Sequence, residues 1–304
     1  MVDASQNKSW SLTGRTCLIT GVTQGIGRIT ALELAKTGCR LLLVARDSRR
    51  GAALVDEIKA NNRGAAVELL IADLSSMAQV RRLATEVKAH TDRLDVLLNN
   101  AGAVFVDRQL SVDGFELTFA LNHLAYFLLT RELLDLVRAT AQQHGSARII
   151  NVASNAHTRA GQIDFDNVML ERGYSARVSY CRSKLANILF TKELARRLTE
   201  QGVRNVTVNC LHPGFVASGF GHNNSRTVSA IMSIAGLFAI SPEAGAKTSI
   251  YLATAPEAGN ETGQYYVKCR PARSSRESMD AEAARRLWEV SEKVLAGVGI
   301  GPAT

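Results

Sequence analysis

Short apolar runs alternate with longer segments of helical periodicity along most of this 304-residue chain. The first run, Thr16 to Thr20, is followed by a helical pattern that extends to Lys36. The later runs are Arg40 to Ala45, Ala66 to Ile71, Leu94 to Leu98, Arg148 to Ala153, Asn205 to Leu211 and, more weakly, Gln264 to Val267. Continuous apolar strands separated by helices are typical of a parallel sheet that is covered on both faces. We therefore predict an α/β fold, a single doubly wound Rossmann-type domain with about seven parallel strands.

The sequence shows no repeat, low-complexity block or linker that would divide this domain. We predict a polar leader over 1–13, one domain over 14–296 and a flexible tail over 297–304. The leader has no apolar core, so it is neither a secretory signal nor a membrane anchor. The longest nearly uncharged stretch, Thr227 to Ile240, is shorter than the roughly 20 residues that span a bilayer. No integral membrane segment is expected.

The chain is basic, with 36 Lys and Arg against 28 Asp and Glu and a net charge of +8. These charges are scattered rather than gathered in a stripe with aromatic residues, which argues against nucleic-acid binding. A polyphosphate cofactor would account for part of the excess. The five cysteines are far apart and the six histidines form no HExxH motif. We expect neither disulfides nor a metal, and a reducing, cytoplasmic location.

A glycine-rich segment, TGVTQGIG, follows the first strand and contains Gly21, Gly25 and Gly27. The amides and the positive dipole end of a helix that begins here suit a pyrophosphate. Glycine permits the close approach of such a ligand to the backbone. The spacing is GxxxGxG rather than the GxGxxG dinucleotide motif, so the match depends on its position between strand and helix.

The second strand ends at Arg46, a residue that suits the 2′-phosphate of NADP. An acidic residue at this position more often binds the ribose of NAD. Asp47 follows immediately and offers that alternative, and a third possibility is that both residues cap the next helix. We favour NADP(H) over NAD(H).

Two further strand ends carry polar or small residues. Asp73 and Leu74 follow the third strand, and Asn100, Ala101 and Gly102 follow the fourth. Each could be ordinary turn chemistry. Because they follow a phosphate-type turn in order, we expect them at the same ligand crevice.

Tyr180 and Lys184 are four positions apart, so they share one face of a helix. A nearby ammonium favours a phenolate, and the pair predicts a lowered Tyr180 pKa useful for acid/base chemistry. The alternative is an amphipathic helix with a packing tyrosine and a solvated lysine.

These motifs occur in one order along the chain, namely TGVTQGIG, Asp73, NNAG at 99–102, Asn122, Ser154, Tyr180 with Lys184, and Pro213-Gly214. In this order the chain resembles the short-chain dehydrogenases/reductases from about Gly14 to Val267. The stretches YCRSKLANILFTKELARRL and VNCLHPGFV are most similar to the retinol dehydrogenase and WW-domain oxidoreductase branch.

The resemblance implies Tyr180 as the general acid/base and Lys184 as the residue that lowers its pKa and holds the nicotinamide ribose. Ser154 would hydrogen-bond the reacting oxygen. Asn122, on a long helix that begins near Gly114, would hold a water linking Lys184 to solvent. The implied cofactor-binding residues are Gly21, Thr23, Gln24, Gly25, Ile26, Gly27, Arg46, Asp73, Leu74, Asn100, Ala101, Gly102, Tyr180, Lys184, Pro213, Gly214, Val216 and Ser218.

Two features depart from the compact members of that family. The gap between Ser154 and Tyr180 is wide, so the intervening residues must form an excursion beside the site. Ser218 stands where the family usually has a threonine near the nicotinamide amide.

The segment at about 213–241, which would cover the substrate, is poor in charge. It favours an apolar carbonyl or alcohol substrate, such as a retinoid, steroid or aldehyde, unless it packs as a core or subunit-interface helix. The resemblance implies an NADP-preferring carbonyl reductase or alcohol dehydrogenase. The alternatives are a nucleotide-binding regulatory or scaffold protein with weak turnover, and an epimerase or dehydratase, for which little chain follows the last strand. A homodimer or a homotetramer is left open.

Overall fold

The computed structural model describes residues 10–214 and 241–301. One eight-stranded sheet forms its centre, with the order β3-β2-β1-β4-β5-β6-β7-β8. The strands are β1 (Thr16–Thr20), β2 (Arg40–Ala45), β3 (Val67–Ile71), β4 (Val96–Asn99), β5 (Ala147–Val152), β6 (Val206–His212), β7 (Tyr265–Val267) and β8 (Arg270–Pro271). The predicted doubly wound fold is confirmed. The eighth strand, which is two residues long and antiparallel to β7, was not expected.

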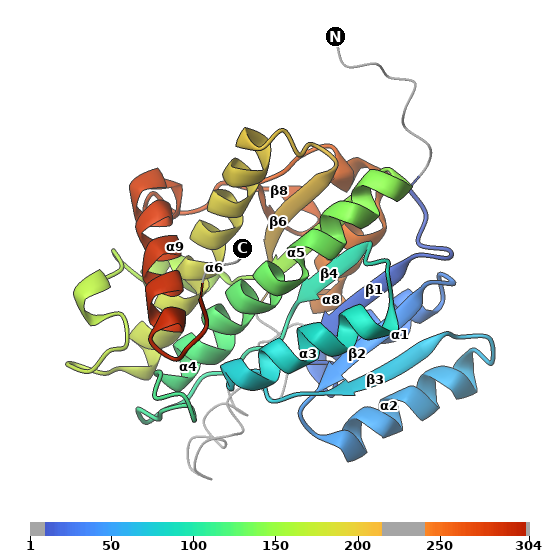
Figure 1. Cartoon of the computed structure of the whole chain (residues 1–304), viewed down its shortest axis with the longest axis horizontal. Coiled ribbons are helices and arrows are strands. Elements are labelled where there is room, and N and C mark those ends of the chain that lie inside the picture. Colours follow the sequence, from blue (N-terminus) through green and yellow to red (C-terminus); the bar gives the residue numbers. More distant parts are fainter. Residues whose placement is uncertain (1–9, 215–240, 302–304) are drawn as a thin grey trace.

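Helices cover both faces of this sheet (Figure 1). They are α1 (Gly25–Ala35), α2 (Ser48–Asn61), α3 (Met77–His90), α4 (Leu117–Phe119), α5 (Ala125–His144), α6 (Ala176–Glu200), α8 (Pro242–Thr254) and α9 (Ala281–Ala296). One apolar core joins the sheet to α3, α5, α6 and α9. A second core joins the opposite face to α1, α2 and α8. The strands β1, β4 and β5 in the middle of the sheet are buried at every residue because helices cover both of their faces, whereas β3 and β8 at the edges are partly or fully exposed.

The N-terminal segment is packed onto the sheet although it was predicted to be part of a polar leader. Trp10 and Leu12 are buried, and Trp10 Nε1 donates to the carbonyl of Ala253 at 2.7 Å. The indole also lies between the guanidinium groups of Arg15 and Arg148, which are 4.0 and 3.8 Å from its ring centre. Such cation–π contacts let a basic chain bury an aromatic ring beside its own charges.

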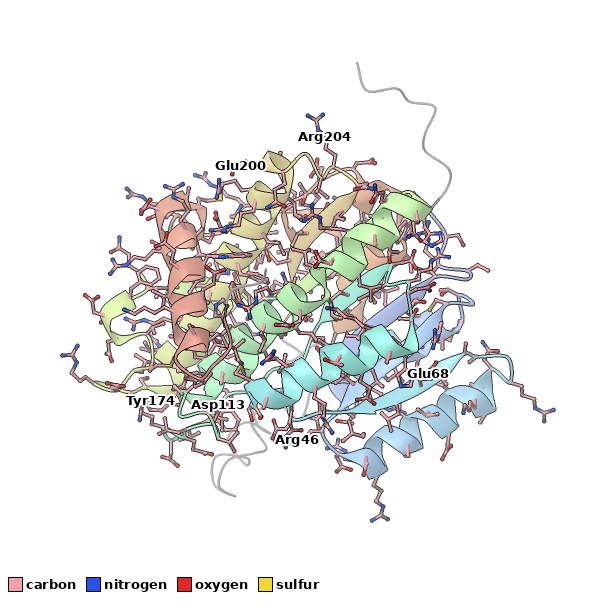
Figure 2. The ribbon with its side chains drawn as sticks, in the orientation of Figure 1. Arg46, Glu68, Asp113, Tyr174, Glu200 and Arg204 are labelled. Atoms are coloured by element: carbon pink, nitrogen blue, oxygen red, sulfur yellow. The ribbon has the colours of Figure 1, made fainter. Side chains whose placement is uncertain are left out.

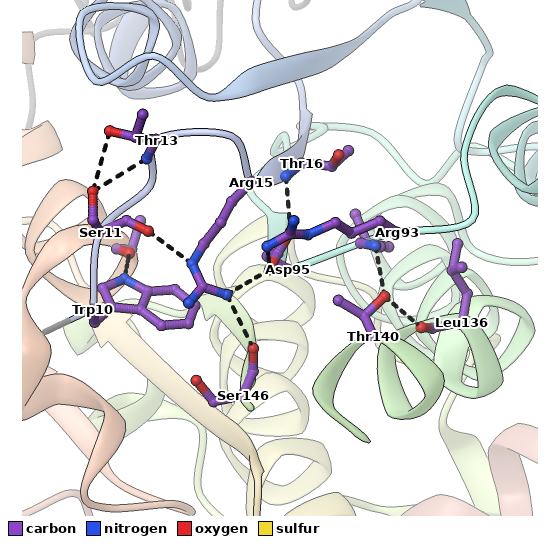
Figure 3. A network of polar contacts seen from close by, with 12 residues as sticks. Trp10, Ser11, Thr13, Arg15, Thr16, Arg93, Asp95, Leu136, Thr140 and Ser146 are labelled. Atoms are coloured by element: carbon purple, nitrogen blue, oxygen red, sulfur yellow. Dashed lines mark hydrogen bonds and ion pairs between the residues drawn. The ribbon is translucent and has the colours of Figure 1, made fainter. Parts of the chain in front are cut away.

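A buried carboxylate, Asp95, links the N-terminal ends of β1 and β4 (Figure 3). Asp95 is fully buried and accepts from Arg15 Nη1 at 2.6 Å, Arg93 Nε at 2.8 Å and the Thr16 backbone amide at 2.9 Å. A buried charge is tolerated only when it is paired in this way. The network therefore fixes the N-terminal end of β1 against β4, at the opposite end of the strands from the predicted site.

No helix in the described ranges is both long and apolar enough to cross a membrane. Within the same ranges, no three His, Cys, Asp or Glu side chains are grouped so that they could hold a metal ion.

Candidate active site

A cavity of about 760 Å³ opens at the carboxyl ends of the parallel strands. It lies beside the point where the strand order reverses between β1 and β4, which is where an open α/β sheet binds its ligand. The predicted site residues that line it are Gly21, Thr23, Gln24, Gly25, Ile26, Gly27, Arg46, Asp73, Leu74, Asn100, Ala101, Gly102, Ser154, Tyr180, Lys184, Pro213 and Gly214. Val216, Ser218 and most of the predicted substrate-covering segment lie outside the described residues. Asn122 is the one predicted site residue of the described ranges that stands behind the cavity wall.

Two glycines, Gly21 in the turn after β1 and Gly27 in the first turn of α1, are required by close contacts. Gly21 has a φ of +71°, and a Cβ placed on it would be 2.7 Å from the Cα of Ala101. A Cβ on Gly27 would overlap the carbonyl oxygen of Gly21 and the side-chain amide of Asn100. Because no side chain fits at either position, the two glycines let this segment pack directly against the residues that follow β4.

The N-terminus of α1 suits an anion. Its N-cap, Gln24, makes no side-chain hydrogen bond to the helix, and the first turn carries no acidic residue. The first amides of the helix therefore receive no hydrogen bond from the Gln24 side chain, and they bear the positive end of the helix dipole. Both features fit the pyrophosphate of a dinucleotide.

Thr20 connects this turn to the end of β4, and the sequence reading missed it. Its Oγ1 accepts from the backbone amides of Asn100 and Ala101 at 2.9 and 3.0 Å. Asn100 Nδ2 in turn donates to the Thr20 carbonyl at 2.8 Å. Thr20 can accept these hydrogen bonds only because β1 pairs with β4. In the sequence alone, a threonine at the end of a strand does not indicate such a role.

The residues after β2 divide between the cavity and the helix. Arg46 is exposed and lines the cavity, and Figure 2 shows it at the same end of the molecule as Asp113 and Tyr174. Asp47 is the N-cap of α2 and accepts from the Arg50 amide at 3.0 Å. The Arg50 side chain, also missed in the sequence, donates to the Thr23 carbonyl at 3.2 Å and to Gln24 Oε1 at 3.0 Å. The capping alternative thus holds for Asp47 and not for Arg46.

Asp73 faces the cavity at the end of β3 and also holds its own turn. Its Oδ1 accepts from the backbone amide and the hydroxyl of Ser75, at 2.9 and 2.7 Å. Asp73 therefore stabilises an ordinary turn and also lines the cavity, so both interpretations of this residue hold.

Ser154 and Tyr180 both line the cavity. Ser154 is the N-cap of the 3-10 helix η3 (Asn155–Arg159), and its Oγ accepts from the Ala156 amide at 3.1 Å. Burial raises the pKa of Tyr180 to about 12, and the nearby Ser154 side chain acts in the opposite direction.

Lys184 lies beside Tyr180 but does not lower its pKa as expected. Lys184 Nζ is buried and donates to the Val152 carbonyl at 2.9 Å, and it lies 5.8 Å from the centre of the Tyr180 ring. Burial lowers the pKa of this amine to about 7. The expectation of an acidified phenol was wrong in direction, because desolvation of the buried phenol raises its pKa.

Asn122 occupies a π-helical segment, Ala120–Leu124, between α4 and α5. Its Nδ2 donates to the Ala103 carbonyl at 2.9 Å and to Ser183 Oγ at 3.0 Å. A Cβ placed on Gly102 would lie 3.1 Å from Asn122 Oδ1 and 3.5 Å from Lys184 Nζ, so the two side chains are close neighbours. The π-helical segment interrupts the long helix that was expected to begin near Gly114. Such π-helical turns inside helices are frequent at functional sites. The water-holding role of Asn122 stays a prediction.

Comparison with known proteins gives the family. The sequence matches the short chain dehydrogenase family over residues 15–229. It is 39% identical to human retinol dehydrogenase 13 over 94% of this chain and 86% of that protein. It is 40% identical to human retinol dehydrogenase 14 over 92% of this chain and 85% of that protein. The chain thus belongs to the short-chain dehydrogenases/reductases, in the retinol dehydrogenase branch.

Solved structures agree with this assignment. An uncharacterised protein from Mycobacterium paratuberculosis has a TM-score of 0.75 and 31% identity, with 98% of each chain covered. The RhlG protein of Pseudomonas aeruginosa, solved as an active-site complex with NADP, has a TM-score of 0.65 and 30% identity over 84% of this chain and 94% of that one. The chain is therefore an NAD(P)-dependent oxidoreductase that acts on CH–OH and C=O groups.

Proposed function

We propose that this protein is an NADP(H)-dependent carbonyl reductase or alcohol dehydrogenase in which Tyr180 is the general acid/base. The observation that carries the proposal is that Ser154, Tyr180 and Lys184 line one cavity together with a phosphate-type glycine turn. Hydride exchange with a carbonyl carbon needs one titratable group and one fixed hydrogen-bond partner at the substrate oxygen.

The nicotinamide cofactor supplies or accepts the hydride when it is bound. Ser154 is fixed as a helix cap, so its hydroxyl can orient the substrate oxygen. A phenol with a pKa of about 12 is protonated at neutral pH, and Tyr180 can donate that proton to the oxygen of a reduced carbonyl. Lys184, held by the Val152 carbonyl, places its amine on the same wall, where we propose that it binds the nicotinamide ribose.

The residues after β2 support the proposed preference for NADP(H). Arg46 lines the cavity at the adenosine end, whereas the Asp47 carboxylate caps α2. An exposed guanidinium suits a 2′-phosphate, and a capping carboxylate is not free to bind two ribose hydroxyls. The NADP complex of RhlG is consistent with this choice.

An apolar substrate is supported by four apolar residues of the described cavity lining, namely Val104, Leu121, Ala156 and Ala176. The same lining also includes Asn155, Arg159 and Arg177. Relatives named retinol dehydrogenases make a retinoid, a steroid or a long-chain aldehyde the first compounds to test. Activity on polar sugars alone would exclude this substrate class.

The test is a panel of carbonyl compounds followed by nicotinamide absorbance, with NADPH and NADH in parallel. We expect turnover of apolar aldehydes or ketones with a lower KM for NADPH than for NADH. Tight NADPH binding without single-turnover reduction of any compound would instead favour a regulatory or scaffold protein. A cytoplasmic location and a homo-oligomeric state remain proposals, to be checked by cell fractionation and by light scattering.

A further inference from the structure

We propose that His157 is a positioning residue that holds Ser154 in place by tying its carbonyl to the C-terminal part of the chain. The inference depends on the proposed function, because it assigns a task to the neighbour of a proposed catalytic group. It concerns a side chain behind the cavity wall, three residues after Ser154 on η3.

Both ring nitrogens of His157 form hydrogen bonds with backbone groups. Nδ1 lies 2.7 Å from the Ser154 carbonyl oxygen, and Nε2 accepts from the Ser275 amide at 3.0 Å. A carbonyl can only accept and an amide N–H can only donate, so Nδ1 carries the proton and Nε2 does not. This polarity defines one neutral tautomer, and an imidazolium would place two donors against each other at Nε2.

The ring is fixed by its surroundings as well as by its hydrogen bonds. His157 is 1% exposed, and its ring meets that of Tyr265 edge-on at 5.0 Å. Burial lowers the pKa of His157, while the bond to Ser154 and the charge of Glu277 act in the opposite direction. His212 on β6 is a further titratable neighbour. The neutral form that the hydrogen bonds require is therefore also the form that burial favours.

The far anchor is itself rigidly held. Ser278 Oγ donates to the Ser275 carbonyl at 2.7 Å, at the start of the 3-10 helix η7 (Glu277–Met279), which leads into α9. His157 thus connects β5, which ends just before Ser154, to a segment 118 positions later in the chain. Without this connection, the Ser154 backbone is held by its 3-10 turn and by the bond from the Ala153 amide to the Leu211 carbonyl alone, and we expect its hydroxyl to shift relative to Tyr180.

The two bonds can be separated by substitution. An asparagine amide reaches the position of Nδ1 and can still donate to the Ser154 carbonyl, whereas a glutamine amide reaches the position of Nε2 and can still accept from Ser275. We expect His157→Gln and His157→Ala to lower kcat about 10-fold or more, since small displacements of reacting groups are costly. His157→Asn should keep kcat within about 3-fold of the wild type, with NADPH affinity unchanged in all three.

Thermal unfolding provides the control for a merely structural role. The asparagine and glutamine variants each lose one buried hydrogen bond, so we expect similar losses of stability but different losses of kcat. Equal kcat for these two variants would overturn the proposal. If no variant folds, ¹⁵N NMR of the wild-type imidazole decides, because a proton on Nε2 contradicts the positioning bond.

Failure of this inference can be told apart from failure of the proposed function. Tyr180→Phe is assayed in the same panel. If it turns over as fast as the wild type, the proposed function fails. If it is inactive while all His157 variants keep wild-type kcat, only the role of His157 fails.

Discussion

The Asn122 side chain binds the backbone of Ala103 on both sides, with Nδ2 donating to its carbonyl and Oδ1 accepting from its amide, each at 2.9 Å. The amide of a buried π-helical residue thereby fixes the segment that follows β4 and borders the cavity. Its remaining hydrogen bond goes to Ser183, next to Lys184. Asn122 therefore couples the NNAG segment to α6.

Asn122→Ala should lower the free energy of unfolding by about 2 kcal/mol, because it leaves the Ala103 amide and carbonyl without partners. We also expect weaker NADPH binding, since the cavity wall at Ala101 and Gly102 loses its support. Urea unfolding and a fluorescence titration measure the two effects. Asn260→Ala, at an exposed position, is the matched control and should change neither.

Tyr180→Phe should retain NADPH affinity and lose most turnover, because phenylalanine keeps the ring and removes the proton donor. Equilibrium binding and single-turnover reduction give the two readouts. Tyr251→Phe on α8, a tyrosine that does not line the cavity, should behave as the wild type. Wild-type turnover in the Tyr180 variant would refute its assignment as general acid/base.

Arg46→Gln should raise the KM for NADPH at least about 10-fold and change that for NADH little, because the guanidinium provides a charge-assisted contact to a phosphate. Initial rates with both cofactors test this. Asp47→Ala is the comparison, and it should cost about 1 kcal/mol of stability through loss of the α2 cap without reversing the cofactor preference. Equal losses for both cofactors in Arg46→Gln would speak against NADP selection at this position.

The buried Lys184 amine predicts how stability depends on pH. Its pKa falls to about 7 in the folded protein, below the usual value of about 10.4, so the unfolded chain binds more protons between these two values. Stability should rise with pH from about 7 to 10, by at most about 1.4 kcal/mol per pH unit from this group. Lys184→Met should remove this rise in urea unfolding measured across that range. An identical slope in both proteins would contradict the assigned shift.

Asp95→Ala should destabilise the protein by about 3 kcal/mol, since it leaves the buried Thr16 amide without a partner and two arginines without their shared carboxylate. Glu33→Ala, which breaks the exposed pair with Lys36, should cost less than about 1 kcal/mol. Activity at saturating substrate should survive in both, because neither residue lines the cavity. Equal losses in the free energy of unfolding for the two variants would show that the buried Asp95 network stabilises the protein no more than an exposed ion pair does.

Much of the site could be predicted because its chemistry is local in the sequence. The turn with Gly21 and Gly27 and the i, i+4 pair of Tyr180 and Lys184 depend on residues only a few positions apart. The strand runs were found for a similar reason, since a strand buried on both faces is apolar along its whole length. Boundaries were less certain, and β4 begins at Val96 rather than Leu94.

The amino-acid sequence by itself determined the doubly wound fold, the family and the order of the site motifs, because periodicity, glycine turns and helix spacing operate over short stretches of chain. Only the tertiary structure decided that Thr20 joins two strand ends, that Asp47 caps a helix while Arg46 faces the cavity, and that His157 reaches Ser275. It also reversed the expected pKa shift of Tyr180. The physical reason is that burial and long-range hydrogen bonds depend on which distant segments pack together, and desolvation of a phenol cannot be read from the spacing of its neighbours.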